Sequence, residues 1–239
     1  MAGLGYRGLA FDGWGTPDPM VNHLLSRTSG AALAAGIGAI GMAFQRTKPL
    51  HPEGRLQRGT ISRLGTHEPT GVPLLDDEGT IPAIVRLSRG VGLPEALPDF
   101  PGLAIRIDPD GKPADILLAG TGLGSVSRFV LVPRQSTKDG PLTTLLPYRS
   151  QGGPLMIGAL PEGERSYQLQ WSRGTGEWLT FARLDLGERI EDDLDVSFDP
   201  VVNLVPGLEQ YPWVRMLREP AYRLARWRSD RSAKVPSQP

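Results

Sequence analysis

The fold of this chain is constrained most by a series of short apolar segments that begins after Pro49 and is punctuated by glycine, proline and aspartate. In the last third of the series, Tyr167, Leu169 and Trp171 alternate with polar residues and would share one face of a strand. Short strands with hairpin-length connections predict an antiparallel barrel or sandwich. Nine such segments follow one another: GTISRLG, AIVRLSRG, GLAIRID, ADILLAG, SRFVLVPR, PLMIGAL, SYQLQWSR, EWLTFARLDLG and DLDVSFDP.

Turn-forming residues and flanking helical patterns complete this picture. The 239 residues include 30 glycines and 23 prolines, which suit many short strands better than a helical bundle. The sequence DPDGKPAD (108–115) predicts a turn with a positive φ at Gly111. Helices are expected over about 21–45 and 212–228, the second one kinked or restarted at Pro220.

We therefore expect an α+β chain that is mainly β, with an antiparallel barrel between an N-terminal helix and a C-terminal helix. Neither an internal repeat nor an evident linker divides the sequence, so a single domain over residues 1–239 is predicted. It would comprise an N-terminal arm and helix (1–49), the barrel (50–200) and a C-terminal helical segment (201–239).

Composition excludes several functional classes. The 26 basic and 26 acidic residues balance, so no global field favours nucleic acid. The sequence has no cysteine, which excludes disulfides and thiolate metal sites. It has only three histidines, which excludes most histidine-rich metal sites. A metal-dependent phosphoester hydrolase, which needs clustered His and Asp ligands, is the least favoured class. The cysteine usage and the absence of a secretory signal pattern at the start make the cytoplasm the default location.

One uncharged stretch, residues 30–44, bears on membrane contact. It is shorter than the roughly 20 apolar residues of a membrane span, and many of its residues are alanine or glycine. A buried or surface-docked helix is the preferred interpretation, and a peripheral membrane contact through this stretch stays open.

Two local motifs could carry chemistry. His51 stands in KPLHPEG, where the first helix is expected to give way to the barrel, although a lone histidine is more often structural. Arg86 and Ser88 in AIVRLSRG are two residues apart and would point to the same side of a strand.

The third motif lies near the end of the chain. Arg218, Tyr222 and Arg226 follow at i, i+4 and i+8, so a helix would bring them onto one face. A guanidinium one turn from a phenol favours the phenolate form, which is the form that binds ferric iron. An arginine-rich solvated face explains the same pattern without chemistry.

Taken in order, these motifs resemble those of the haem catalases. HPEG (51–54) matches the distal H-x-x-G motif of that family, and VRLS (85–88) is close to its V-R-F-S strand motif. PDFPGLAIRI (98–107) follows in place of the family's R-D-P-R-G-F-A-V-K-F. Arg218 to Tyr222 reproduces the proximal R-x-x-x-Y motif.

The resemblance implies a catalase-like antiparallel barrel that holds haem b. It implies that Tyr222 is the proximal iron ligand, with Arg218 as its charge partner. It also implies that His51 is the distal acid and base, oriented by Ser88, while Arg86 and Lys48 face the haem propionates. Catalase-like proteins are commonly oligomers, so a homo-oligomer is also implied.

The chain departs from the family pattern at one distal residue. The stretch that corresponds to the family's D-L-V-G-N-N, residues 115–120, contains no asparagine. We therefore predict peroxidase-type processing of hydrogen peroxide or an organic hydroperoxide rather than fast peroxide disproportionation. The alternative is a haem-free barrel that binds a lipid or another apolar ligand.

Overall fold

The computed structural model describes residues 54–90, 97–108, 111–190, 196–216 and 218. Within these residues there is one short α-helix, α2 (Pro73–Asp76), one 3₁₀ helix (Ser127–Phe129), and a helical stretch at 212–216 and 218. The strands are β1 (Arg55–Leu64), β2 (Glu78–Arg89), β3 (Pro101–Ile107), β4 (Ala114–Gly120), β5 (Leu142–Thr143), β6 (Tyr148–Ser150), β7 (Gly153–Pro161), β8 (Ser166–Arg173), β9 (Leu179–Arg189) and β10 (Glu209–Gln210).

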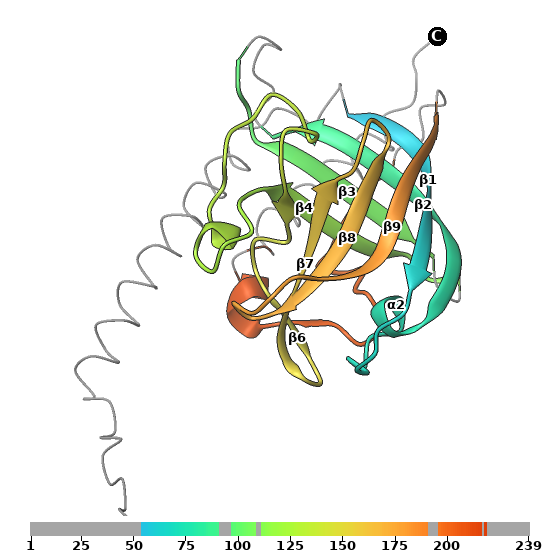
Figure 1. The fold of residues 1–239 in the computed structure, drawn as a ribbon, viewed down its shortest axis with the longest axis vertical. Helices are drawn as coiled ribbons and strands as arrows, with labels where there is room; N and C mark the ends of the chain where they lie inside the picture. Colours follow the sequence, from blue (N-terminus) through green and yellow to red (C-terminus); the bar gives the residue numbers. More distant parts are fainter. Residues whose placement is uncertain (1–53, 91–96, 109–110, 191–195, 217, 219–239) are drawn as a thin grey trace, which may run out of the picture.

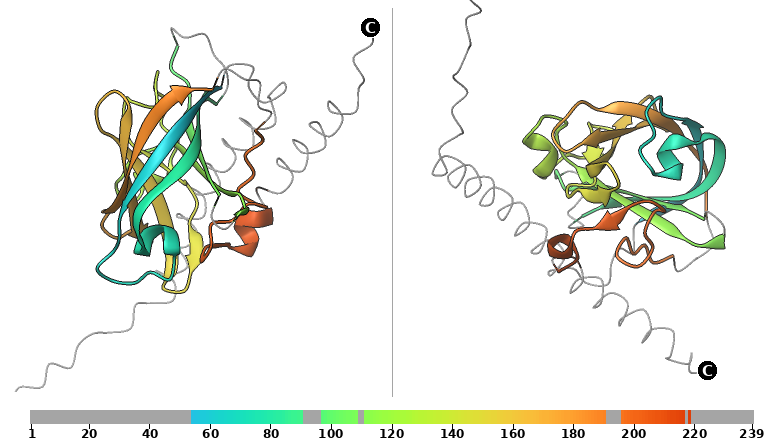
Figure 2. Two further views of the ribbon diagram at one scale, coloured as in Figure 1. Left: turned by 90° about the vertical axis from the view of Figure 1, so that its right-hand side faces the viewer. Right: turned by 90° about the horizontal axis from the view of Figure 1, so that it is seen from below.

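The strands form a closed antiparallel barrel (Figure 1). The sheet order is β10-β6-β7-β5-β4-β3-β2-β1-β9-β8, and an additional β7–β8 pairing joins its two sides. Eight strands therefore make the ring, while β6 and β10 extend from β7 outside it. The view from below shows the strands surrounding a common axis (Figure 2). The prediction of a mainly β chain with an antiparallel barrel is confirmed, and the barrel replaces the sandwich left open by periodicity.

Alternation along each strand fills the barrel with apolar side chains. Tyr167 and Leu169 are buried as the pattern of β8 predicts, and Trp171 is 5% exposed. Burying one large aliphatic or aromatic side chain stabilises the fold by about 1.5–3 kcal/mol. The interior is a packed core, and its largest fully buried members include Phe181, Ile61, Leu75, Leu103, Ile105, Ile116, Leu142, Leu155 and Ile157.

Two of the nine predicted strand segments are not strands. Residues 127–134 form a 3₁₀ helix and a loop with one isolated bridge, because the buried Arg128 bonds to backbone carbonyls in place of a ladder. Residues 196–199 are irregular, because their backbone bonds to the side chains of Arg106 and Asp115. The prediction also missed β5, β6 and β10, which are too short to show periodicity.

Tight turns connect the strands where the sequence predicts them. Gly111 has a φ of 73°, as expected for the turn between β3 and β4. The connection between β1 and β2 is held by the Asp76 carboxylate, which accepts hydrogen bonds from Thr70 N and Gly71 N at 2.8 Å each. The hydroxyls of Thr66 and Thr70 donate to the same carboxylate.

Candidate functional site

The predicted pair Arg86 and Ser88 lies on the outer face of the barrel. Along β2, Ala83 and Val85 belong to the core, and the intervening side chains point the opposite way. Both Arg86 and Ser88 are half-buried. Their prediction as a same-face pair therefore agrees with the strand register, and the face that they share is outside the barrel.

The same outer face continues across β3 and β4, where most of its residues are glycine or alanine. Arg86 pairs with Ala104, which pairs with Leu117, while Ser88 pairs with Gly102. Directly paired residues of an antiparallel sheet point to the same side. We call this surface the outer platform, formed by Gly102, Ala104, Leu117 and Ala119 beside Arg86 and Ser88.

Gly102 is required for close packing at the Ser88 side of the platform. A Cβ on Gly102 would lie 2.7 Å from Ser88 Oγ, a distance that real Cβ atoms do not tolerate. The Ser88 hydroxyl donates weakly to the Gly102 carbonyl oxygen at 3.5 Å. Because Gly102 has no side chain, nothing protrudes from the platform beside the Ser88 hydroxyl. The resemblance to catalases assigns this hydroxyl the role of orienting His51.

Two of the predicted motifs meet at the edge of the platform. Gly54 is the last residue of HPEG, and Arg86 is the second residue of VRLS. A Cβ on Gly54 would lie 2.2 Å from Arg86 Nε and 2.9 Å from Arg86 Cζ. The backbone of the first motif thus lies directly against the guanidinium of the second.

Arg218 contacts the barrel one residue beyond the platform. Its Nη2 donates to the Thr144 carbonyl oxygen at 3.1 Å. The preceding residue, Thr143, pairs with Ala119 of the platform. Spacing of about 4.8 Å per strand places the Cα atoms of Ser88 and Thr143 about 14 Å apart across this row. Arg218 therefore attaches to the sheet at the far side of the platform from β2.

The acceptor of this bond belongs to a strained turn. Leu145 has a φ of 60°, and Leu146 N donates to the Thr144 carbonyl oxygen at 2.6 Å. This is a γ-turn with positive φ, which is rare for a residue with a branched side chain. Arg218 supplies a second, charged donor to the carbonyl of that turn.

Three predicted site residues, Lys48, His51 and Tyr222, lie outside the described residues, as does the uncharged stretch at 30–44. The expected helix over 21–45 falls there too, and so does most of the helix expected from 212 to 228. Among the helices of the described residues, none is long and apolar enough to cross a membrane.

The two asparagines of the family motif correspond to Ala119 and Gly120, and Ala119 belongs to the platform. Ala119 pairs with Gly102, and Thr143 follows on the other side of it. The Thr143 hydroxyl is not a substitute for the amide, because it donates to the Arg128 carbonyl oxygen at 2.8 Å and accepts from Thr121.

Sequence reasoning missed an ion pair between the half-buried Arg106 and the buried Asp115, on the same side of the sheet as the platform. Arg106 Nε and Nη2 donate to the two carboxylate oxygens of Asp115 at 2.7 and 2.6 Å. The same carboxylate accepts from Asp199 N and Asn203 Nδ2, both at 2.7 Å. Through these bonds the pair holds the segment after β9 to β3 and β4. Figure 2 shows this segment beside the outer side of the two strands. The sequence contained a signal for this pair, because a hairpin turn near Gly111 makes Arg106 and Asp115 cross-strand partners.

A second missed group is the buried guanidinium of Arg128. It donates to the Ser172 hydroxyl at 2.8 Å and to the carbonyls of Gly174 and Gly176 at 3.0 and 2.9 Å. The Trp178 ring lies 4.7 Å below its Cζ, and burial lowers the pKa of Arg128. The side chain fastens the β8–β9 turn to the loop after β4, and so has a structural role.

Comparison with solved structures places this barrel among catalase-like folds. A crystal structure of a fungal catalase superposes with a TM-score of 0.51 over 73% of this chain and 58% of that chain, at 11% sequence identity. The chain thus spans less than two thirds of that catalase. At this identity the likeness concerns the fold alone. No family model and no curated protein sequence matches the chain.

Proposed function

We propose that this protein binds haem b beside the outer platform and processes hydroperoxides by a peroxidase-type reaction. The observation that carries the proposal is the contact between Gly54 and Arg86. These residues belong to two motifs that the resemblance to catalases assigns to one haem pocket. The barrel similar to that of a fungal catalase is the second support.

The platform suits a flat ring with acidic side groups. Gly102, Ala104 and Ala119 carry little or no side chain, so a planar ligand could approach the sheet closely. Arg86 beside them supplies a guanidinium, whose planar fork suits a carboxylate such as a propionate. The residues described on this face are therefore compatible with haem.

The remaining contacts are assigned from the motifs. Tyr222 would hold the iron, Arg218 would stabilise the phenolate, and Lys48 would face a propionate. Bound haem iron would carry the two oxidising equivalents of the peroxide to a co-substrate. Because the bond from Arg218 to the Thr144 carbonyl fixes its guanidinium at the platform's far side, Tyr222 would follow one helical turn later.

Proton transfer would belong to His51. Its imidazole would take a proton from one peroxide oxygen and return it to the other oxygen, which would leave as water or, from an organic hydroperoxide, as an alcohol. The Ser88 hydroxyl, held at the platform by its contact with Gly102, would orient that imidazole. Ala119 provides no amide to position a second peroxide. An organic co-substrate would therefore supply the two electrons that return the site to its resting state.

The alternative of a haem-free barrel with an apolar ligand receives less support. Apolar side chains fill the barrel interior, from Ile61 on β1 to Phe181 on β9. A lipid could not occupy that core without displacing close-packed side chains. The outer platform, rather than the interior, is the better surface for a ligand.

A hemin titration tests the proposal. Ala104→Leu would raise the platform and is expected to reduce the amount of hemin bound at least about tenfold. Thr60→Leu, an exposed residue of β1 outside the platform, is the matched control and should bind like the wild type. Equal hemin binding by both variants would contradict the placement of haem on this face.

A further inference from the structure

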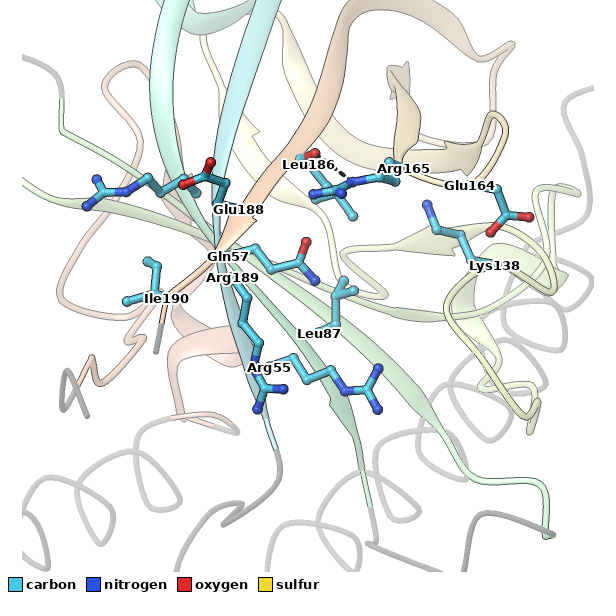
Figure 3. A pocket seen from close by; sticks show the side chains of 11 residues that line it. Arg55, Gln57, Leu87, Lys138, Glu164, Arg165, Leu186, Glu188, Arg189 and Ile190 are labelled. Atoms are coloured by element: carbon cyan, nitrogen blue, oxygen red, sulfur yellow. Dashed lines mark hydrogen bonds between the residues drawn. The ribbon is translucent and has the colours of Figure 1, made fainter. Parts of the chain in front are cut away.

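The end of the barrel at which β1 begins and β9 ends, called here the open end, carries a cationic depression. The proposed haem site does not include it. Its volume is about 820 Å³, within the range of small-molecule pockets. Arg55 and Gln57 reach it from β1 and Arg189 from β9, while Leu87 and Leu186 form apolar parts of its wall. Figure 3 shows Arg55, Gln57 and Arg189 directed into one space beside Leu87.

The two strand arginines lie on neighbouring strands, and no described carboxylate forms an ion pair with either of them. Gln57 pairs with Arg189, so Arg55 is the diagonal neighbour of Arg189 on the adjoining strand. Among the described residues, neither guanidinium makes a side-chain hydrogen bond or an ion pair. An anion that lies between the two guanidiniums would be attracted by both of them.

Two further cations are held in place at the same end. Lys138 Nζ lies 3.8 Å from the centre of the Tyr167 ring and 3.4 Å from the Ser166 carbonyl oxygen. Arg165 Nε donates to the Leu186 carbonyl oxygen at 3.2 Å, and its Nη2 donates to the Gly187 carbonyl. Burial lowers the pKa of Lys138, and the nearby Glu164 opposes that change.

Among the described residues that line the depression, positive charges outnumber negative ones, which favours an anion. Arg55, Lys138, Arg165 and Arg189 face two carboxylates, those of Glu164 and Glu188. Arg58 also borders the depression, but it pairs with Ile84, which alternates with the core residues of β2. It therefore belongs to the outer side of the barrel.

We propose that this end of the barrel binds a small phosphate monoester, with Arg55, Arg189 and Lys138 around the phosphate. A phosphate carries a charge of about −1.5 to −2 and three acceptor oxygens, so it can accept bonds from cations on different sides at once. A planar carboxylate suits a single guanidinium better. The apolar wall of Leu87 and Leu186 would contact the organic part of the ester.

Calorimetric titration of the full chain with phenyl phosphate tests the site. We expect saturable binding that weakens at least about tenfold in the double variant Arg55→Gln/Arg189→Gln, because two charge-assisted contacts are lost. Arg149→Gln is the matched control, since Arg149 is exposed and its ion pair among the described residues is with Glu209, on another part of the molecule. It should bind phenyl phosphate like the wild type.

Two results would overturn the proposal. One is equal binding of phenyl phosphate by the double variant and by Arg149→Gln. The other is binding of benzoate as tightly as phenyl phosphate by the wild type, which would show that the site does not select a phosphate. Both substituted arginines are exposed, so the variants should keep the wild-type unfolding temperature. Hemin uptake by the double variant should be unchanged, which separates this site from the proposed haem site.

Discussion

Gly54 lies so close to Arg86 that any side chain at position 54 would meet the guanidinium. A Cβ there would be 2.2 Å from Nε. The contact joins the segment that carries His51 to the strand that carries Ser88. It is therefore the described contact on which the haem proposal depends most directly.

Gly54→Ala is expected to displace the Arg86 guanidinium. The resulting loss in the free energy of hemin binding should exceed the loss in the free energy of unfolding. Arg86→Ala should lower hemin affinity as well. If both act through the same contact, the double variant should lose little more affinity than Arg86→Ala alone. Hemin titrations of the four proteins measure this coupling, and strictly additive losses would show that the contact does not support the site.

The ion pair between Arg106 and the buried Asp115 carboxylate predicts a large stability effect. Asp115→Ala leaves the Arg106 guanidinium without its bidentate partner and removes acceptors from the segment after β9. We expect a loss of about 3–5 kcal/mol in the free energy of unfolding, measured with urea.

The exposed pair of Arg149 and Glu209 is the control for that experiment. Its side chains are 59% and 62% exposed, so Glu209→Gln should cost at most about 1 kcal/mol. Similar losses in the two variants would mean that Asp115 does not anchor the segment.

Much of the barrel could be predicted from alternation, because a strand with one buried face leaves a period of two. The strands of two or three residues could not, since their pairing depends on neighbours distant in the sequence. Arg106 and Asp115 were within reach of prediction, because the turn at Gly111 sets their register. Arg128 was not, because its acceptors are mostly backbone carbonyls that lie up to 48 residues away.

The candidate site was predictable to a different degree. The spacing of Arg86 and Ser88 predicts that both side chains lie on the same face of β2. Only the closed barrel shows that this is the outer face. The contact with Gly54 depends on where β1 begins relative to β2. The cations at the open end come from four separate parts of the chain, so periodicity gave no signal for them.

Asp76 predicts how stability depends on pH. Burial opposes its ionisation, but hydrogen bonds from Thr70, Thr66 and Gly71 outweigh burial and lower its pKa from 3.8. A lowered carboxyl pKa stabilises the folded state above pH 3.8, and this stabilisation is lost as the pH falls through the folded value.

Asp76→Asn is the corresponding test. At pH 7 it should reduce the free energy of unfolding by about 1–3 kcal/mol, since hydrogen bonds to the carboxylate are weakened. The difference from the wild type should shrink as the pH falls below 3.8. Urea titrations at several pH values measure it, and a difference that grows with acid would contradict the assignment.

Ala119→Asn tests the account of the missing asparagine. An amide at this position would face the platform beside Ser88 and Gly102, so we expect oxygen release from hydrogen peroxide to increase in the hemin-loaded protein. Leu117→Asn is the control, because Leu117 lies two residues away on the same side of β4. An equal effect of both variants would show that position 119 has no special role.

The absorbance spectrum of the full-length protein after addition of hemin tests the central claim most directly. We predict a Soret band typical of high-spin ferric haem with a tyrosinate ligand, and loss of most of it in Tyr222→Phe. Arg226→Ala should keep the band, because the motif requires only Arg218 and Tyr222. Equal haem content and the same spectrum in the wild type and Tyr222→Phe would contradict the proposed haem site.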